Sequence, residues 1–193
     1  MSKSPMSKSP VIFSRPSPLA SVAVPGRFGA DRGAPGVVLS VVHPHSLATV
    51  IARSGKAKAT KEALAALRAV SVMWAGVDQY FVKSAITVEG ALAADLKKKL
   101  AGIASVIDQS HGRVTIRITG DHARAVLAKG TPVDLHPDEF PVGQSAVTQM
   151  AHVGIHLTRV AEDAYELSVF RGFAESFWQW LTEMSLEFGY QVS

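Results

Sequence analysis

The sequence predicts an α+β fold made of two similar units that follow one another along the chain. Two observations lead to this prediction. Short β-branched runs of strand length alternate with Ala- and Leu-rich stretches that have helical spacing. The order strand, helix, strands, helix also occurs twice, over residues 37–104 and 105–193. Two units of this ferredoxin-like type can bury one face of every element, so residues 37–193 are interpreted as one domain.

The first 36 residues lie outside this regular pattern. Residues 1–10 are a perfect duplication of the pentapeptide MSKSP, which has little apolar surface to bury and is predicted to be a disordered tail. Residues 11–36 combine apolar side chains with many prolines and glycines. We expect them to form an extended arm that lies against its own domain or another subunit. In this arm, Phe13, Leu19 and Val22 are candidate partner contacts.

The first unit is predicted to begin with a strand and a helix. Residues 37–43 read VVLSVVH, a β-branched run of strand length. Residues 43–55 are predicted to be helical, because proline and serine stand near their start and glycine at their end. A basic linker, 56–61, then leads into a second, short helix over the Ala- and Leu-rich residues 62–70.

A hairpin and an amphipathic helix complete the first unit. Residues 70–76 and 79–86 are predicted to be strands that flank a turn. The helix over residues 89–103 is supported by one apolar stripe and by a cluster of lysines near its C-terminal end, where the helix dipole favours cations. The stripe consists of Leu92, Leu96, Leu100 and Ile103.

The second unit shows the same succession of elements. Residues 113–120 alternate apolar and polar side chains, as expected for a strand with one buried face. Residues 121–130 are predicted to be a helix that starts at Asp121 and stops at Gly130. Three strands are expected within residues 145–171.

The chain ends in a predicted aromatic helix over residues 173–189. Its expected buried stripe is Phe173, Phe177, Trp180, Leu181 and Met184. Trp178 lies off this stripe and is therefore predicted to be exposed. Because exposed tryptophans on helices often anchor interfaces, Trp178 is a further candidate partner contact.

Charge and composition exclude several classes of function. The formal net charge of +4 comes entirely from the first 36 residues, since the remainder has 15 basic and 15 acidic residues. A nucleic-acid partner is therefore not expected, because it needs a basic face. The absence of cysteine excludes disulfides and thiol chemistry and fits a cytoplasmic protein. No apolar run approaches the roughly 20 residues of a membrane span.

The histidines do not form a recognisable metal site. His152 and His156 would lie more than about 13 Å apart along a strand and could not share one ion. His43 and His45 flank a proline at a predicted helix start, where turn roles are usual. No third ligand is positioned by spacing, so neither a metal nor a cofactor is predicted in this chain.

Catalytic motifs are equally weak. The tetrapeptide Asp108–His111 contains an acid, a hydroxyl and an imidazole, but the members of a triad converge from different loops. A turn is the favoured interpretation. Residues 129–143, KGTPVDLHPDEFPVG, gather three acids and a histidine among three prolines. We interpret them as a connection between a helix and a strand. No catalytic residue is predicted.

Several motifs together resemble the gamma subunit family of heterotetrameric sarcosine oxidases. These are G-x-x-A-R-x-V-L-A-K-G, D-L-H-P-x-x-F-P-x-G, A-H-V-G and R-x-F-A-x-S-F-W-x-W-L, with SPLA and WAGVDQYFV further upstream. The resemblance covers nearly all of the chain after the MSKSP duplication. The sequence departs from the family pattern at Val77, where proline is common, and at Gly172, where serine is common.

The resemblance implies a fold related to the folate-binding domain of aminomethyltransferases. It also implies a complex that oxidises sarcosine to glycine, forms hydrogen peroxide and passes the one-carbon unit to tetrahydrofolate. In such complexes the alpha subunit carries NAD and the folate domain, the beta subunit carries FAD and FMN, and the delta subunit holds zinc. The gamma subunit has no known cofactor, so the expected partners are the alpha, beta and delta subunits.

Two further hypotheses remain beside this one. A stand-alone folate-binding or one-carbon transfer protein of the same fold would bind tetrahydrofolate as an isolated chain. An RNA-binding module of ferredoxin-like units is disfavoured by the balanced charge of residues 37–193.

Overall fold

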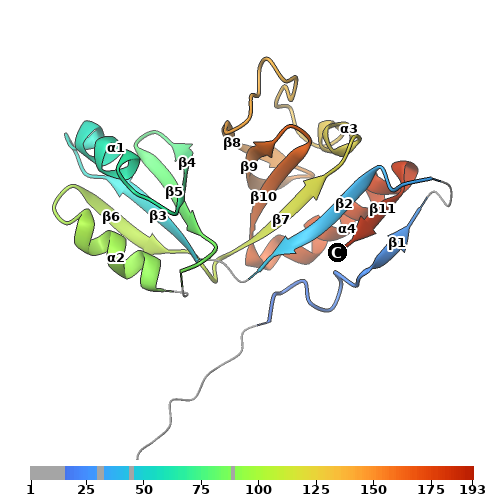
Figure 1. The fold of residues 1–193 in the computed structure, drawn as a ribbon, viewed down its shortest axis with the longest axis horizontal. Helices are drawn as coiled ribbons and strands as arrows, with labels where there is room; N and C mark the ends of the chain where they lie inside the picture. The colour runs from blue at the N-terminus through green and yellow to red at the C-terminus, as the bar shows by residue number, and fades with distance from the viewer. Residues whose placement is uncertain (1–15, 30–32, 44–45, 88–89) are drawn as a thin grey trace, which may run out of the picture.

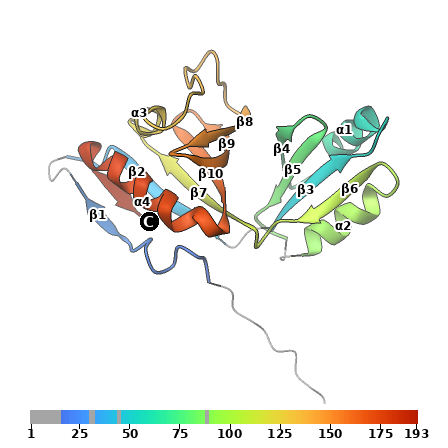
Figure 2. The same ribbon diagram turned by 180° about the vertical axis from the view of Figure 1, so that it is seen from behind.

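A computed structural model describes residues 16–29, 33–43, 46–87 and 90–193. Within these residues the chain forms two sheets that stand side by side, each covered by helices (Figures 1 and 2). The α+β class predicted from the sequence is confirmed. The duplicated tail and Phe13 lie outside the described residues.

The larger sheet has seven strands in the order β1-β11-β2-β7-β10-β9-β8. All its pairings are antiparallel except that of β11 with β2. Its strands are β1 (Gly26–Phe28), β2 (Val37–Val42), β7 (Arg113–Thr119), β8 (Ser145–Met150), β9 (Val153–Ala161), β10 (Ala164–Phe170) and β11 (Tyr190–Val192). Its helical elements are α3 (Ala123–Ala128), η1 (Arg171–Phe173), α4 (Ala174–Ser185) and η2 (Leu186–Phe188).

The smaller sheet has four antiparallel strands in the order β4-β5-β3-β6. They are β3 (Ser46–Ala52), β4 (Ser71–Gly76), β5 (Gln79–Ser84) and β6 (Ala104–Asp108). The helices α1 (Ala57–Ala65) and α2 (Ala91–Lys99) belong to this half (Figure 1). Its β4–β5 hairpin was predicted correctly, and β4 approaches β8 of the larger sheet.

Each sheet has its own apolar core. The larger core joins the inner face of the seven-stranded sheet to α3 and α4, and Leu19 of the N-terminal arm is fully buried within it. The smaller core lies between the four-stranded sheet and its helices, with Val50, Val82 and Leu96 among its members. The other faces of the two sheets are left to meet each other.

The predicted helix over residues 43–55 is wrong, because this segment contains the strand β3. β3 is central in its sheet and pairs with both β5 and β6. Its first five residues are buried, so side chains on both faces are apolar or small. A strand buried on both faces loses the alternation that marks a strand in sequence. Of the two residues taken as the helix start, Ser46 is the first residue of β3, and Pro44 lies outside the described residues.

The chain crosses between the sheets twice. β2 joins the larger sheet although it begins the predicted first unit, and β6 joins the smaller sheet although it opens the second. The three-residue strands β1 and β11 were not predicted. They pair with each other, and β11 continues the sheet beside β2.

The C-terminal helix is present, but its buried face differs from the predicted stripe. α4 buries Phe177, Trp178 and Leu181, whereas Phe173 lies before the helix and is 54% exposed. Trp178 is only 4% exposed. The prediction of an exposed Trp178 is therefore wrong. The buried face of α4 consists of Ala174, Phe177, Trp178, Leu181 and Ser185, so it is rotated about the helix axis relative to the predicted stripe.

Candidate functional site

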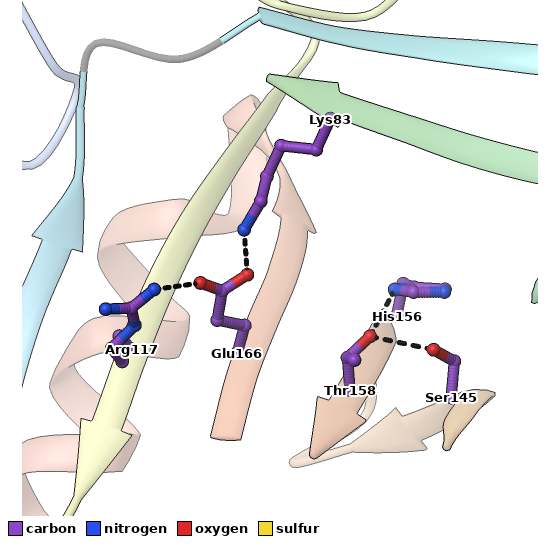
Figure 3. A network of polar contacts seen from close by, with 6 residues as sticks. All are labelled: Lys83, Arg117, Ser145, His156, Thr158 and Glu166. Carbon is purple, nitrogen blue, oxygen red and sulfur yellow. Dashed lines mark hydrogen bonds and ion pairs between the residues drawn. The ribbon is translucent and has the colours of Figure 1, made fainter. Parts of the chain in front are cut away.

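Three charged side chains from both sheets meet where the sheets face each other (Figure 3). Glu166 on β10 accepts a hydrogen bond from Lys83 on β5 and another, of 2.6 Å, from Arg117 on β7. Glu166 is 4% exposed and the Lys83 side chain 13%, whereas the Arg117 side chain is 45% exposed. The carboxylate is thus buried between one buried and one half-exposed cation.

The electrostatics of Glu166 follow from this placement. Burial alone would raise the pKa of its carboxyl, but the hydrogen bonds from Lys83 and Arg117 outweigh that effect, so the pKa lies below its usual value. The group is therefore an anion at neutral pH. A carboxylate held in this way by two donors is a poor proton acceptor for catalysis.

A second group of polar contacts centres on His156 of β9. Its Nε2 lies 2.8 Å from the carbonyl oxygen of Trp74 on β4, which can only accept, so Nε2 carries the proton. Nδ1 faces the hydroxyl of Thr158 at 3.5 Å, and Thr158 contacts Ser145 at 2.9 Å. Burial lowers the pKa of His156, which keeps the ring neutral.

Arg113 of β7 provides the third connection across the junction. Its guanidinium stacks on Phe170 at 4.0 Å and on Phe81 of the smaller sheet at 4.9 Å. It donates one hydrogen bond, of 3.2 Å, to the Ser168 carbonyl. Its Nε is buried without a hydrogen-bond partner among the described residues. Burial lowers the pKa of Arg113. We call Lys83, Arg113, Arg117, His156 and Glu166 the inter-sheet junction.

Two hollows border the Lys83–Glu166 pair. One is a small hollow of about 10 Å³, the size of a single water site, and it is also lined by His156 and Ser168. The other is an open groove of about 600 Å³ that includes Arg117 among its lining residues. The ion pair therefore lies between a small hollow and a large open groove.

Residues singled out as possible chemistry do not converge. His152 occupies the β8–β9 turn with a left-handed backbone, while His156 is buried at the junction. The Ser110 hydroxyl donates to the Asp108 carboxylate at 2.6 Å, as expected for a turn. Within the described ranges, no three His, Asp or Glu side chains are close enough together to hold a metal ion.

The connection over residues 129–143 separates its apolar from its charged side chains. Leu135 and Phe140 are buried in the larger core, whereas the side chains of His136 and Asp138 are well exposed. The buried Arg159 donates to the Phe140 carbonyl at 3.0 Å and so fixes the end of the connection. The charged residues are thus displayed on a surface loop rather than gathered in a pocket.

The candidate partner contacts lie in different environments. Leu19 is fully buried in the chain's own core, so its side chain is not available at the surface. Val22 is 41% exposed and lines a surface groove of about 660 Å³ together with Phe28 and Trp178. Of the described candidates, Val22 alone presents a substantial apolar surface.

Sequence reasoning missed the inter-sheet junction. In β10, Tyr165, Leu167 and Val169 alternate with Glu166 and Ser168, a pattern that predicts one buried and one solvated face. Here both faces are buried, because the smaller sheet covers the polar face. Nothing in the local pattern distinguishes such a strand from a half-exposed one.

The fold places this chain among proteins with a known architecture. It matches glycine cleavage system aminomethyltransferase T from Bartonella henselae with a TM-score of 0.56 at 19% identity, over 76% of this chain and 45% of that chain. A chain of the heterotetrameric sarcosine oxidase from Corynebacterium sp. U-96, in complex with pyrrole 2-carboxylate, matches with a TM-score of 0.74 at 27% identity. That match covers 90% of this chain and 96% of the other.

Sequence comparisons identify the family. Residues 41–187 match the model of the "Sarcosine oxidase, gamma subunit family". Sarcosine oxidase subunit gamma of Arthrobacter sp. is 31% identical over 146 residues, which are 75% of this chain and 70% of that protein. The gamma subunit of Corynebacterium sp. (strain P-1) is 34% identical over 120 residues, 61% of this chain and 58% of that protein. This chain belongs to the sarcosine oxidase gamma subunit family, as its motifs predicted.

Within the residues described, no helix has the length and apolar character needed to cross a bilayer.

Proposed function

We propose that this chain is a non-catalytic gamma subunit of a heterotetrameric sarcosine oxidase. The complex would convert sarcosine, oxygen and tetrahydrofolate into glycine, hydrogen peroxide and methylene-tetrahydrofolate. The observation that carries the proposal is the family match over residues 41–187, which agrees with the fold match to a chain of the Corynebacterium sp. U-96 complex. The proposed partners are alpha, beta and delta subunits, which would hold NAD, FAD, FMN, zinc and tetrahydrofolate.

The chemistry of the inter-sheet junction supports a non-catalytic role. Glu166 is occupied by two cations, and both ring nitrogens of His156 have hydrogen-bond partners. A general base needs a lone pair that can reach a substrate proton. These groups instead direct their hydrogen-bonding capacity at one another, and they connect the two sheets.

The test is assembly of the complex from its proposed parts. Co-expression with the candidate alpha, beta and delta chains of the same genome, followed by affinity capture through this chain, is expected to yield a yellow, flavin-bearing complex that produces peroxide from sarcosine. In that complex, His156→Gln is expected to leave kcat close to wild type. Colourless capture, or an intact complex whose kcat falls more than a hundredfold in His156→Gln, would contradict the proposal.

A matched pair of surface variants tests where the partners bind. Val22→Asp places a charge in the groove beside α4, whereas Val142→Asp changes an equally apolar residue, 57% exposed, on the connection before β8. We expect Val22→Asp to reduce recovery of the partner chains and Val142→Asp to leave it unchanged. Equal recovery of the partner chains with both variants would show that Val22 is not part of the interface.

A further inference from the structure

The open groove beside the inter-sheet junction has the dimensions of a small-molecule site. Its volume of about 600 Å³ lies within the usual range of roughly 300–1,000 Å³ for such pockets. Its apolar lining includes Val42, Val70, Ile86 and Val160. Its polar lining consists of the charged Lys83, Arg117 and Glu166 together with Ser71 and Ser84. An apolar wall with a few converging polar groups is the usual composition of a ligand pocket.

Among the described residues that line the groove, the charged side chains carry an unbalanced positive charge. Lys83 and Arg117 share the single carboxylate of Glu166, and each uses one donor on it. An ammonium has three N–H donors and a guanidinium has five. One net positive charge with unused donors thus borders the groove, which suits a ligand with one negative charge and several acceptor lone pairs.

The apolar wall of the groove is held in place by the loop after β5. The Ser84 hydroxyl accepts a hydrogen bond from the Thr87 backbone N–H at 3.2 Å, and the Ser46 hydroxyl donates to the Thr87 carbonyl at 2.9 Å. Ile86, which lies between Ser84 and Thr87 in the chain, is 80% exposed. Ile86 thus adds an exposed apolar side chain to the edge of the groove, on a loop whose backbone is held by hydrogen bonds.

Backbone strain occurs at the same place. Ala69 lines the groove with φ +57°, a left-handed conformation that costs a residue with a Cβ about 1–2 kcal/mol. Such conformations are concentrated at ligand-binding and active sites. The other three non-glycine residues with positive φ among the described residues lie in hairpin turns, where this conformation is usual.

We propose that this groove binds a small monocarboxylate with an apolar body. The carboxylate would lie against the free donors of Lys83 and Arg117, and the apolar body against Ile86, Val70 and Val160. A monoanion fits better than a phosphate dianion, because Glu166 already neutralises one of the two cations. This site goes beyond the proposed function, because all the residues that would bind the ligand belong to this chain and the subunit role does not require a ligand here.

The test uses the full chain with benzoate as the probe and benzamide as its neutral isostere. Two-dimensional ¹H–¹⁵N NMR titrations at constant ionic strength are expected to show saturable benzoate shifts at Val42, Val70 and Val160, and benzamide is expected to bind roughly tenfold more weakly or worse. Arg117→Gln, which removes the net charge, should weaken benzoate by a similar factor. The matched variant Arg124→Gln, on the exposed face of α3, should not.

A second variant keeps the test decisive if Arg117→Gln folds poorly. Ile86→Ala changes an exposed side chain and is expected to weaken benzoate and benzamide by the same factor, since it alters only the apolar contact. Equal affinity for the two probes, wild-type affinity in both groove variants, or no saturable binding would each overturn the inference. A chain that assembles into the oxidase yet fails these tests would overturn this inference and leave the proposed function standing.

Discussion

Replacing Glu166 with glutamine is expected to lower the free energy of unfolding by about 3 kcal/mol. The carboxylate is almost fully buried and accepts from Lys83, whose side chain is 13% exposed. Removing one partner of a buried ion pair costs about 3–5 kcal/mol, because the other charge stays buried. Glutamine keeps one acceptor, and the half-exposed Arg117 can turn to water, so the lower end of this range applies.

Urea unfolding of the full chain, followed by tryptophan fluorescence, measures this loss. The control is Asp95→Asn, which breaks the exposed pair with Lys99 (2.8 Å) and is expected to cost less than about 0.5 kcal/mol. Lys83→Met added to Glu166→Gln should recover much of the loss, because no unpaired ammonium then remains. A Glu166→Gln loss no larger than that of Asp95→Asn would refute the reasoning.

The stability difference between wild type and Glu166→Gln is expected to depend on pH. The pKa of Glu166 is lower in the folded chain than the unfolded value of about 4.3. Its stabilising contribution is therefore complete above about pH 4.3 and is lost as the pH falls through the folded pKa. The stability difference between wild type and Glu166→Gln should shrink in that acid range, and a difference that is constant down to full protonation would contradict the assignment.

Two further predictions concern His156 and a close-packed glycine. Burial lowers the pKa of His156 below its unfolded value of about 6.5, so the unfolded chain binds a proton that the folded chain excludes, and the free energy of unfolding should fall as the pH drops below about 6.5. His156→Gln should flatten this part of the stability profile measured by urea unfolding. An unchanged slope would count against a buried neutral imidazole. Gly130→Ala should lower the free energy of unfolding by about 1–3 kcal/mol in the same assay, since a Cβ would lie 2.4 Å from the Trp180 ring. Gly172→Ala, where a Cβ would meet open space, should lower it by less than about 0.5 kcal/mol. Equal losses would refute the packing argument.

Elements with a clear local signal were the ones predictable from sequence. The strand β7 alternates apolar and polar side chains, the helix α2 has one apolar stripe, and a turn marks the β4–β5 hairpin. β3 is buried on both faces, and its Leu47, Val50 and Ile51 fit a helical stripe as well as a strand. Propensity could not separate the two cases, because the deciding factor is the pairing of β3 with β5 and β6, which are distant in sequence.

The inter-sheet junction was beyond local reasoning for a related cause. Lys83, Arg117 and Glu166 come from three strands, and Lys83 lies 83 residues from Glu166. Each resembles a solvated charge on an ordinary half-buried strand. Only the stacking of one sheet on the other brings the three together, and that stacking depends on the crossings made by β2 and β6. The family motifs, in contrast, were readable, because each is a continuous stretch of the chain that needs no knowledge of long-range contacts.

The junction is better understood as a device for orientation than as a source of stability. Buried charges pay a desolvation cost that their attraction roughly repays, so an apolar junction of the same shape could be equally stable. Apolar contacts, however, are non-directional and would tolerate sliding of one sheet over the other. Hydrogen bonds from Lys83 to Glu166 and from His156 to the Trp74 carbonyl are satisfied in one register only. These directional contacts fix one arrangement of the two sheets, which is a role that apolar side chains of the same shape could not fill.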